Sequence, residues 1–132
     1  MPVKELKVMF AGGLKVDAEY KGFTIKTDQP VYEGGEGTAP APFDLFLASL
    51  GTCAGYYVLA FCQQRKIPTD NAHLVLRTVR EQGAKLISKI TIEIHLPADF
   101  PEKYRGAVVK AADSCAVRLH LDHPPIFETL AI

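Results

Sequence analysis

Three cysteines, Cys53, Cys62 and Cys115, are the residues of this chain best suited to chemistry. A thiolate is a strong nucleophile, and two thiols within reach of each other can form a disulfide. Cys53 and Cys62 lie nine residues apart on one predicted helix, where about 100° of rotation per residue places them on opposite sides. Cys53 and Cys115 are therefore the natural pair within one subunit. The alternative is that they are buried as small apolar side chains, as free cysteines often are, and for Cys62 we favour it.

The helix that must carry Cys53 is predicted over residues 43–66, where apolar residues occur nearly all round, and Pro68 ends it. Such a helix is expected to be buried on most sides. Residues 45–62 are uncharged for 18 residues, the lower limit of a membrane span. Because this stretch contains two glycines, a serine and a threonine, we interpret it as a core helix and expect no membrane partner.

Period-two alternation predicts strands in two groups, residues 5–10, 14–21 and 23–25 and then residues 73–80 and 90–96. A second helix is predicted between Pro101 and Pro124, with Cys115 in its middle on the buried stripe. A last strand is predicted over residues 126–132. The order β-β-β-α-β-β-α-β indicates an α+β fold in a single domain of residues 1–132. The excess apolar surface of the first helix points to a partner subunit.

The charges of the chain balance, with 15 Lys plus Arg and 15 Asp plus Glu. This balance argues against a nucleic-acid partner, because phosphate contacts require an excess of basic residues on one face. The chain opens with no signal-peptide pattern, and its cysteine count is odd. Both features favour a reducing compartment, and we expect the cytoplasm.

Two further features of the sequence could form sites. His120 and His123 could suggest a metal, but Pro124 indicates that the helix ends there, so these histidines are expected to satisfy free carbonyls. We expect no metal and no cofactor. Residues 28–42 form a loop rich in glycine and proline, which is long enough to act as a lid or a subunit contact.

Two segments around the cysteines carry a family resemblance. Asp28-Gln29-Pro30, the glycines at 34, 35 and 37, and residues 41–53 (APFDLFLASLGTC) resemble the signature of the OsmC/Ohr family, in the branch whose motif ends in Leu-Gly-x-Cys. Residues 111–117 (AADSCAV) resemble the second cysteine motif of that family, Cys-x-Val. The order of elements matches the family over nearly the whole chain.

The resemblance implies an intertwined homodimer with long central helices packed on antiparallel sheets and active sites at the subunit interface. It also implies reduction of organic hydroperoxides, in the setting of a stress response. Cys53 would attack the peroxide and become a sulfenic acid, and Cys115 would resolve it to a disulfide. An external dithiol, such as a lipoylated protein, would then reduce the disulfide.

The chain departs from this family at the groups that activate the thiolate. The peroxidases place a glutamate ten residues before the first cysteine, where this chain has Phe43, followed by Asp44. The family arginine comes from the N-terminal hairpin, yet no arginine precedes Arg65. Asp44, Lys15 and Arg118 are possible supporting residues. Each has an ordinary alternative, a helix N-terminal charge for Asp44 and a solvated surface position for Lys15 and Arg118.

Three functions therefore remain open on the sequence. The first is a thiol peroxidase for small organic hydroperoxides. The second is a non-catalytic dimer that binds a small apolar ligand at the subunit interface, and the third is a thiol redox sensor. In either of the first two, the pocket beside Cys53 is expected to involve Phe43, Ser49, Tyr56 and Tyr57.

Overall fold

Two antiparallel sheets and three α-helices make up the computed structural model of this chain, which describes residues 2–132. This content confirms the predicted α+β class. The contacts divide the chain into a unit that ends at Phe46 and a unit that runs from Leu47 to Ile132. The two are described separately, and the single domain expected from the sequence stays a prediction.

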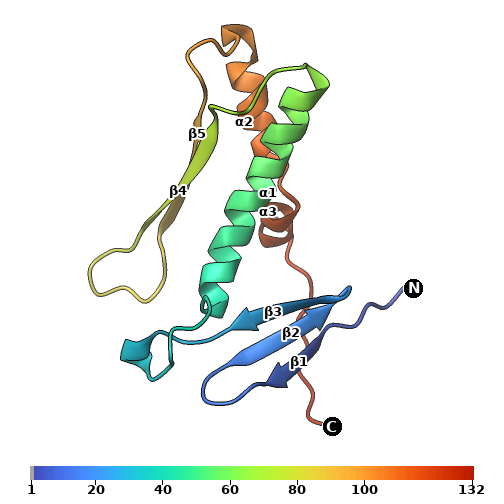
Figure 1. Cartoon of the computed structure of the whole chain (residues 1–132), viewed down its shortest axis with the longest axis vertical. Helices are drawn as coiled ribbons and strands as arrows, with labels where there is room; N and C mark the ends of the chain where they lie inside the picture. Colours follow the sequence, from blue (N-terminus) through green and yellow to red (C-terminus); the bar gives the residue numbers. More distant parts are fainter. Residues whose placement is uncertain (1) are drawn as a thin grey trace. The chain divides into compact units, whose positions relative to one another are not determined.

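The first unit contains a three-stranded meander, β1 (Lys7–Phe10), β2 (Val16–Tyr20) and β3 (Phe23–Thr27), in the order β1-β2-β3 (Figure 1). Tyr20 pairs with Phe23, so only Lys21 and Gly22 connect β2 to β3. Both have positive φ, 52° and 80°, which is the geometry of a tight hairpin turn. The meander predicted from alternation is confirmed.

The loop after β3 is organised around the carboxylate of Asp28, which is only 1% exposed. It accepts hydrogen bonds from the Thr38 hydroxyl (2.7 Å) and from the backbone N–H groups of Thr38 (3.1 Å), Gln29 (2.7 Å) and Glu36 (3.3 Å). Hydrogen bonds from the Thr38 side chain and backbone, with those of Gln29 and Glu36, lower the pKa of Asp28 to about 2 against the opposing effect of burial. The loop, which includes a short turn of 3₁₀ helix at Val31–Glu33, is therefore held by one buried charge.

The long helix α1 (Pro42–Gln64) matches its sequence prediction within two residues and carries the core of the second unit. Its buried side chains form one stripe: Leu50, Ala54, Val58, Phe61 and Cys62. The expectation that it is buried on most sides is wrong for a single chain, because Tyr56 is 61% exposed and Leu59 is 39% exposed. By length and composition α1 could also cross a membrane, with 28% of its most apolar window buried. Its interpretation as a core helix rests on the stripe that packs in the hydrophobic cluster.

The sheet of the second unit is the hairpin of β4 (His73–Val79) and β5 (Lys89–His95), which lies beside α1 and the second helix (Figure 1). Leu74 pairs with Ile94, and Leu76 pairs with Ile92. Because side chains alternate along a strand, these four residues share one face. Leu74, Ile92 and Ile94 pack against the core cluster of α1.

The second helix is not continuous, and here the sequence prediction is wrong. A turn of 3₁₀ helix (Glu102–Tyr104) leads into α2 (Arg105–Asp113). The helix is interrupted at Ser114 and Cys115, and α3 (Ala116–Asp122) follows. Asp113 and Ser114 favour helix ends because their side chains compete for backbone hydrogen bonds. The Ser114 hydroxyl does so, donating to the carbonyl of Lys110 at 3.3 Å. Cys115 is buried, as expected, but it is the N-cap of α3 rather than a mid-helix residue.

The strand predicted over residues 126–132 is also absent from the described chain, where this segment has no regular structure. Ile126 is 98% exposed and Phe127 is 86% exposed. A strand needs a neighbouring strand for its backbone hydrogen bonds, and none pairs with this segment here. In the single chain described here, this segment of alternating apolar residues therefore has no neighbouring strand to pair with.

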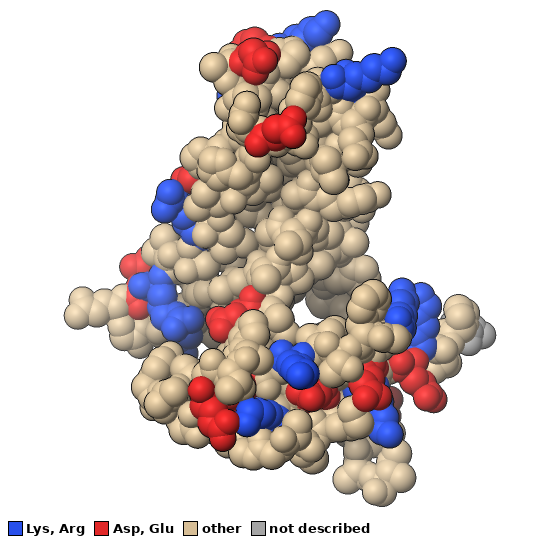
Figure 2. All heavy atoms as spheres, in the orientation of Figure 1, with Lys and Arg blue, Asp and Glu red and all other residues tan. Residues whose placement is uncertain are grey.

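Charged side chains are mixed over the face of the molecule in Figure 2, where basic and acidic groups lie interspersed. Ion pairs join some of them, including Lys15 with Glu36 and Arg77 with Glu93. On that face no broad basic area is seen. The absence of a nucleic-acid partner stays a prediction from the balanced charge.

Candidate active site

The second unit brings together two of the three cysteines that the sequence singled out. Cys53 is half-buried in the middle of α1, and Cys115 is 1% exposed at the start of α3. Their thiols are close enough that an interaction between them contributes to the pKa shifts of both. All three cysteines are free thiols. The pairing of Cys53 with Cys115 within one subunit, which the sequence proposed, is therefore realised as a contact between reduced side chains.

The pKa of Cys53 is lowered from its ordinary value by its hydrogen-bond donors. Burial alone would raise the pKa, but the Cys115 thiol and the backbone N–H groups of Val117 and Ala116 outweigh it. Each of these donors stabilises the thiolate more than the thiol. Cys53 is thus the sulfur of the pair that ionises more readily.

The pKa of Cys115 moves in the opposite direction. Burial raises it most, and the hydrogen bond and charge interaction with Cys53 raise it further, against smaller effects of the Arg118 and Val117 backbone amides. Two sulfurs in contact cannot both carry a negative charge cheaply. The two pKa values therefore move apart, and Cys53 loses its proton more readily than Cys115.

The amides that face Cys53 come from the first turn of α3. Ala116 and Val117 are its first two residues, and the N–H groups at a helix start have no acceptor inside the helix. The break at Ser114 and Cys115 is what frees them. These donors leave no side-chain pattern in the sequence because they belong to the main chain, although Asp113-Ser114 indicates a helix end.

Each of the two cations that the sequence proposed forms an ion pair with a carboxylate. The Lys15 ammonium pairs with Glu36 at 2.7 Å in the first unit. The Arg118 guanidinium pairs with Asp113 at 3.0 Å, and its contribution near the cysteines is its backbone amide. Activation by the side chain of Lys15 or Arg118 therefore stays a prediction without a geometric argument in its favour.

Asp44 has a structural role at the start of α1. Its carboxylate accepts a hydrogen bond from the backbone N–H of Ala41 at 3.1 Å, and it lies in the first turn of the helix, where a negative charge is favourable. The interpretation of Asp44 as a helix N-terminal charge is confirmed. Phe43, where the peroxidases have glutamate, packs its ring against Phe46 at a centroid distance of 5.4 Å.

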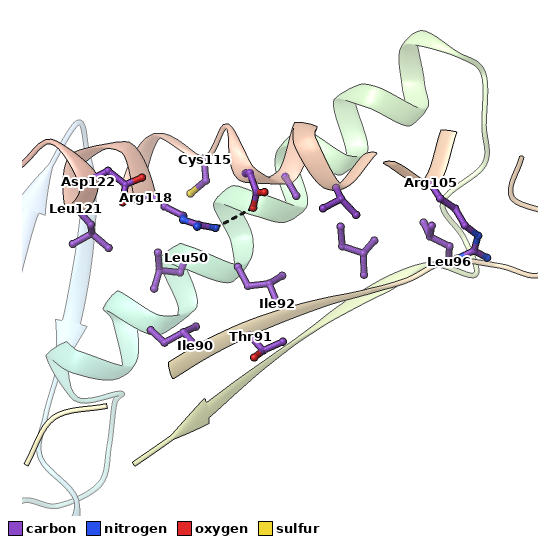
Figure 3. A pocket seen from close by; sticks show the side chains of 14 residues that line it. Leu50, Ile90, Thr91, Ile92, Leu96, Arg105, Cys115, Arg118, Leu121 and Asp122 are labelled. Atoms are coloured by element: carbon purple, nitrogen blue, oxygen red, sulfur yellow. Dashed lines mark hydrogen bonds and ion pairs between the residues drawn. The ribbon is translucent and has the colours of Figure 1, made fainter. Parts of the chain in front are cut away.

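A cavity of about 540 Å³ lies in the second unit between β5 and the α2–α3 segment (Figure 3). This volume is within the usual range for small-molecule sites. Ile90, Ile92 and Ile94 form one wall, and Leu50 of α1 and Cys115 also line it. The four residues expected in a pocket beside Cys53 do not line this cavity. Tyr57 packs edge-on against the exposed Tyr56 at 5.2 Å. The pocket role of Phe43, Ser49, Tyr56 and Tyr57 stays a prediction.

Cys62 and His120, two other side chains that could do chemistry, have structural roles. Cys62 is buried in the core cluster, and burial raises its pKa. The side chain therefore favours the neutral thiol, which agrees with a space-filling role. The His120 ring donates through Nδ1 to the carbonyl of Ala116 at 2.7 Å; Ala116 is the first residue of α3, so the expectation that His120 and His123 satisfy the free carbonyls at the helix end stays a prediction. Within residues 2–132, no three His, Cys, Asp or Glu side chains are grouped to hold a metal.

A comparison with models of known protein families shows to which family the chain belongs. A family model described as OsmC-like protein matches residues 35–129, which includes both cysteines of the pair. The chain belongs to the OsmC-like family. Comparison with curated proteins found no matching sequence.

Solved structures share the OsmC-like fold. A protein from Psychrobacter arcticus 273-4, named for osmotic stress induction and detoxification response, superposes with a TM-score of 0.74 at 23% identity, over 90% of this chain and 88% of its own. An organic hydroperoxide resistance protein OsmC from Legionella pneumophila gives 0.58 at 17% identity, over 92% and 90%. A protein from Vibrio cholerae, named for organic hydroperoxide resistance and carrying captopril in one active site, gives 0.55 at 19% identity, over 94% and 88%. At these identities the likeness concerns the fold.

Proposed function

We propose that this OsmC-like protein is a cysteine-dependent reductase of organic hydroperoxides. The observation that carries the proposal is the proximity of Cys53 and Cys115, whose interaction moves their pKa values apart. A peroxidase needs one thiolate to attack and one thiol held ready to resolve the product. A pair of buried space-filling cysteines would need neither the contact nor the backbone donors at Cys53.

The reaction follows from the two roles. The Cys53 thiolate attacks the distal peroxide oxygen, the O–O bond breaks, and the alkoxide leaves and takes up a proton as the alcohol. Cys53 is now a sulfenic acid. The Cys115 sulfur, as its thiolate, then attacks Cys53, forms the S–S bond and expels hydroxide, which takes the thiol proton and leaves as water. An external dithiol returns the pair to two thiols and is itself oxidised to a disulfide.

An organic peroxide is preferred over hydrogen peroxide because the surroundings of Cys53 are apolar. Leu50, Ala54 and the aromatic pair Tyr56–Tyr57 are its neighbours along α1. The names of the structural neighbours from Legionella pneumophila and Vibrio cholerae agree with this substrate class. The expected setting, a stress response in the cytoplasm, belongs to the same proposal.

The working form of the protein is proposed to be an intertwined homodimer. Tyr56 and Leu59 lie on the face of α1 opposite its buried stripe, and the C-terminal segment leaves its apolar side chains exposed. A second copy would cover such surfaces. Tyr56→Glu should therefore shift the mass measured by analytical ultracentrifugation from dimer toward monomer. Leu86→Glu, at an exposed position between β4 and β5, is the control and should leave the measured mass unchanged. A wild-type protein that stays monomeric would contradict the dimer.

The activity is tested by mixing reduced protein with one equivalent of cumene hydroperoxide and following peptide masses over time. We expect rapid loss of peroxide and a Cys53–Cys115 disulfide. Cys53→Ser should abolish both, whereas Cys115→Ser should consume one equivalent and stop at the sulfenic acid. Cys62→Ser, which alters the third cysteine, should behave as wild type. Unmodified Cys53 after minutes in wild-type protein would refute the peroxidase.

One observation favours a second function, the binding of a small apolar ligand without catalysis. The cavity beside β5 has the volume of a ligand site and one aliphatic wall, formed by the isoleucines of β5, together with charged lining residues such as Arg105 and Asp122. A binding protein would take up an apolar fluorescent probe equally well in wild type and in Cys53→Ser, and would leave the peroxide intact. A redox sensor, the third possibility, would oxidise once and change its assembly state.

A further inference from the structure

The β4–β5 hairpin carries two histidines directly opposite each other. His73, the first residue of β4, pairs with His95, the last residue of β5. Their imidazole rings are stacked, with centroids 4.6 Å apart and planes within 2° of parallel. Side chains directly opposite on neighbouring strands are held close by the backbone of both strands. The sheet therefore fixes two imidazoles together at one place.

The two histidines lie on the face of the sheet that points away from the core. Leu74 and Ile94, their neighbours along the two strands, pack against the core cluster. Because successive side chains of a strand point to opposite faces, His73 and His95 lie on the other face. Both residues are exposed, and the His95 side chain is 46% accessible. An ion in solution therefore has access to the rings.

Glu93 determines which nitrogen of His95 is available to a ligand. Its carboxylate comes from the same face of β5, and its Oε1 is 3.0 Å from Nε2 of His95. An ionised carboxylate only accepts hydrogen bonds, so Nε2 carries the hydrogen and Nδ1 of the neutral ring keeps its lone pair. The other oxygen of Glu93 accepts a hydrogen bond from Nε of Arg77 at 2.9 Å. Arg77 thus helps to hold the carboxylate against His95.

A carboxylate on the far nitrogen of an imidazole is a common arrangement around protein-bound metals. Metal-binding histidines almost always donate their second ring N–H to a carboxylate, a carbonyl or water, which fixes the ring and makes the first nitrogen a better ligand. Glu93 stands in this relation to His95. His73 supplies a second imidazole at the adjoining position.

The spacing of the two rings suits chelation of one ion. Zinc binds imidazole nitrogens at about 2.0–2.1 Å, so a tetrahedral ion holds two of them about 3.3 Å apart. Rings whose centroids are 4.6 Å apart reach this separation when their nitrogen edges tilt toward each other. Since His73 and His95 are exposed, the face they occupy leaves room for such a tilt.

We propose that His73 and His95 form a two-nitrogen site for a divalent transition metal of the zinc type, with the Glu93 carboxylate behind His95. Ions of this type prefer imidazole, whereas Mg²⁺ and Ca²⁺ prefer oxygen ligands. Water fills the remaining positions, so the site needs no third protein ligand, in keeping with the lack of a three-residue cluster within residues 2–132. The bound ion ties the first residue of β4 to the last residue of β5. The site is independent of the cysteine pair and of the proposed function.

Zinc titration followed by NMR of the imidazole nitrogens tests the site. Long-range ¹H–¹⁵N spectra of the reduced protein, labelled with ¹⁵N on histidine, are recorded at neutral pH as Zn²⁺ is added. We expect Nδ1 of His95 and one nitrogen of His73 to shift together, before His120 and His123 respond. Because the signals belong to histidines, zinc held by cysteine thiols does not affect the result. If His73 and His95 do not shift ahead of the other two histidines, the proposal is overturned.

Removal of one ring distinguishes chelation from two histidines that bind separately. His73→Ala should raise the zinc concentration at the midpoint of the His95 shift about tenfold or more, because the second imidazole then no longer acts within the same molecule. His123→Ala, which removes an exposed histidine outside the hairpin, is the matched control and should leave the midpoint unchanged. Circular dichroism checks that both variants fold. An unchanged midpoint in folded His73→Ala would overturn the shared site.

Glu93→Gln tests the carboxylate behind His95. Glutamine keeps an oxygen acceptor but loses the charge, so zinc affinity should fall several-fold. In the metal-free variant, the ¹⁵N shifts of His95 should show a smaller share of the tautomer with hydrogen on Nε2. If Glu93→Gln changes neither the zinc midpoint nor the tautomer, the role of Glu93 in the proposal is overturned.

Discussion

Arg118 forms an ion pair with Asp113 across the break that contains Cys115, with Nη1 3.0 Å from Oδ1. The pair joins the last residue of α2 to the first turn of α3. Both side chains are about half exposed, so solvent screens the interaction and it contributes about 0.2–1 kcal/mol at most. In this arrangement the Arg118 guanidinium pairs with the Asp113 carboxylate. Backbone N–H groups stabilise the Cys53 thiolate, a role for which the sequence suggested a cation.

Arg118→Gln should therefore lower the free energy of unfolding by less than about 1 kcal/mol and leave the pH midpoint of Cys53 alkylation unchanged. The midpoint is measured from iodoacetamide labelling rates at a series of pH values, read by peptide mass. Arg118→Lys, which keeps the charge, is the comparison. An upward shift in Arg118→Gln that Arg118→Lys restores would show that the guanidinium activates the thiol after all.

Ala116→Pro should raise the pKa of Cys53, because it removes one backbone N–H that stabilises the thiolate. The first position of a helix accepts proline, and Cys115 already has the extended geometry (φ −50°, ψ 123°) that a residue before proline requires. The helix should therefore survive. Alkylation of Cys53 should need a higher pH than in wild type. Ala116→Ser keeps the N–H and should match wild type; identical midpoints in the proline and serine variants would rule out the amide.

Acid should weaken the first unit through Asp28. The folded pKa of about 2 lies below the ordinary 3.8, so the stabilisation is complete above the unfolded pKa and is lost as pH falls through about 2. Asp28→Asn should be less stable than wild type at neutral pH, and the difference should shrink as the pH falls toward about 2. Urea unfolding followed by circular dichroism measures it, with the exposed Glu33→Gln as control. A difference that does not change with pH would contradict the assignment.

Gly35→Ala should destabilise the Asp28 loop by about 2 kcal/mol or more, because a Cβ there would overlap the backbone carbonyl of Gln29. The obstacle is main chain, which cannot rotate away. Gly106→Ala is the matched control, since its Cβ would meet nothing nearby and it lies in α2. That change should be neutral or stabilising by up to about 1 kcal/mol. Thermal unfolding of the two variants compares them, and equal melting temperatures would show that the loop adapts.

Local patterns in the sequence predicted the long helix and the strands of both sheets. The apolar run that was expected over residues 43–66 forms α1 at Pro42–Gln64, and alternation located all five strands of the two sheets. The pairing of Cys53 with Cys115 followed from helical rotation, which separates Cys53 from Cys62, together with the family motifs. These features depend on periodicity, which each segment carries by itself.

The features that were missed depend on partners elsewhere. The apolar spacing of Ala111, Ala112 and Cys115 continues through the helix break, so the pattern gives no warning of it. Alternation over residues 126–132 cannot form a strand without a neighbouring edge. The partner of Lys15 is Glu36, which is 21 residues away and beyond any local pattern.

Because the hydrogen-bond donors at Cys53 belong to the main chain, the site tolerates substitution during evolution. A codon change at position 116 or 117 alters a side chain and leaves the peptide N–H in place, for every amino acid except proline. The support of the thiolate is therefore insensitive to nearly all single substitutions at the residues that provide it. It could persist through long divergence while leaving no invariant side chain behind.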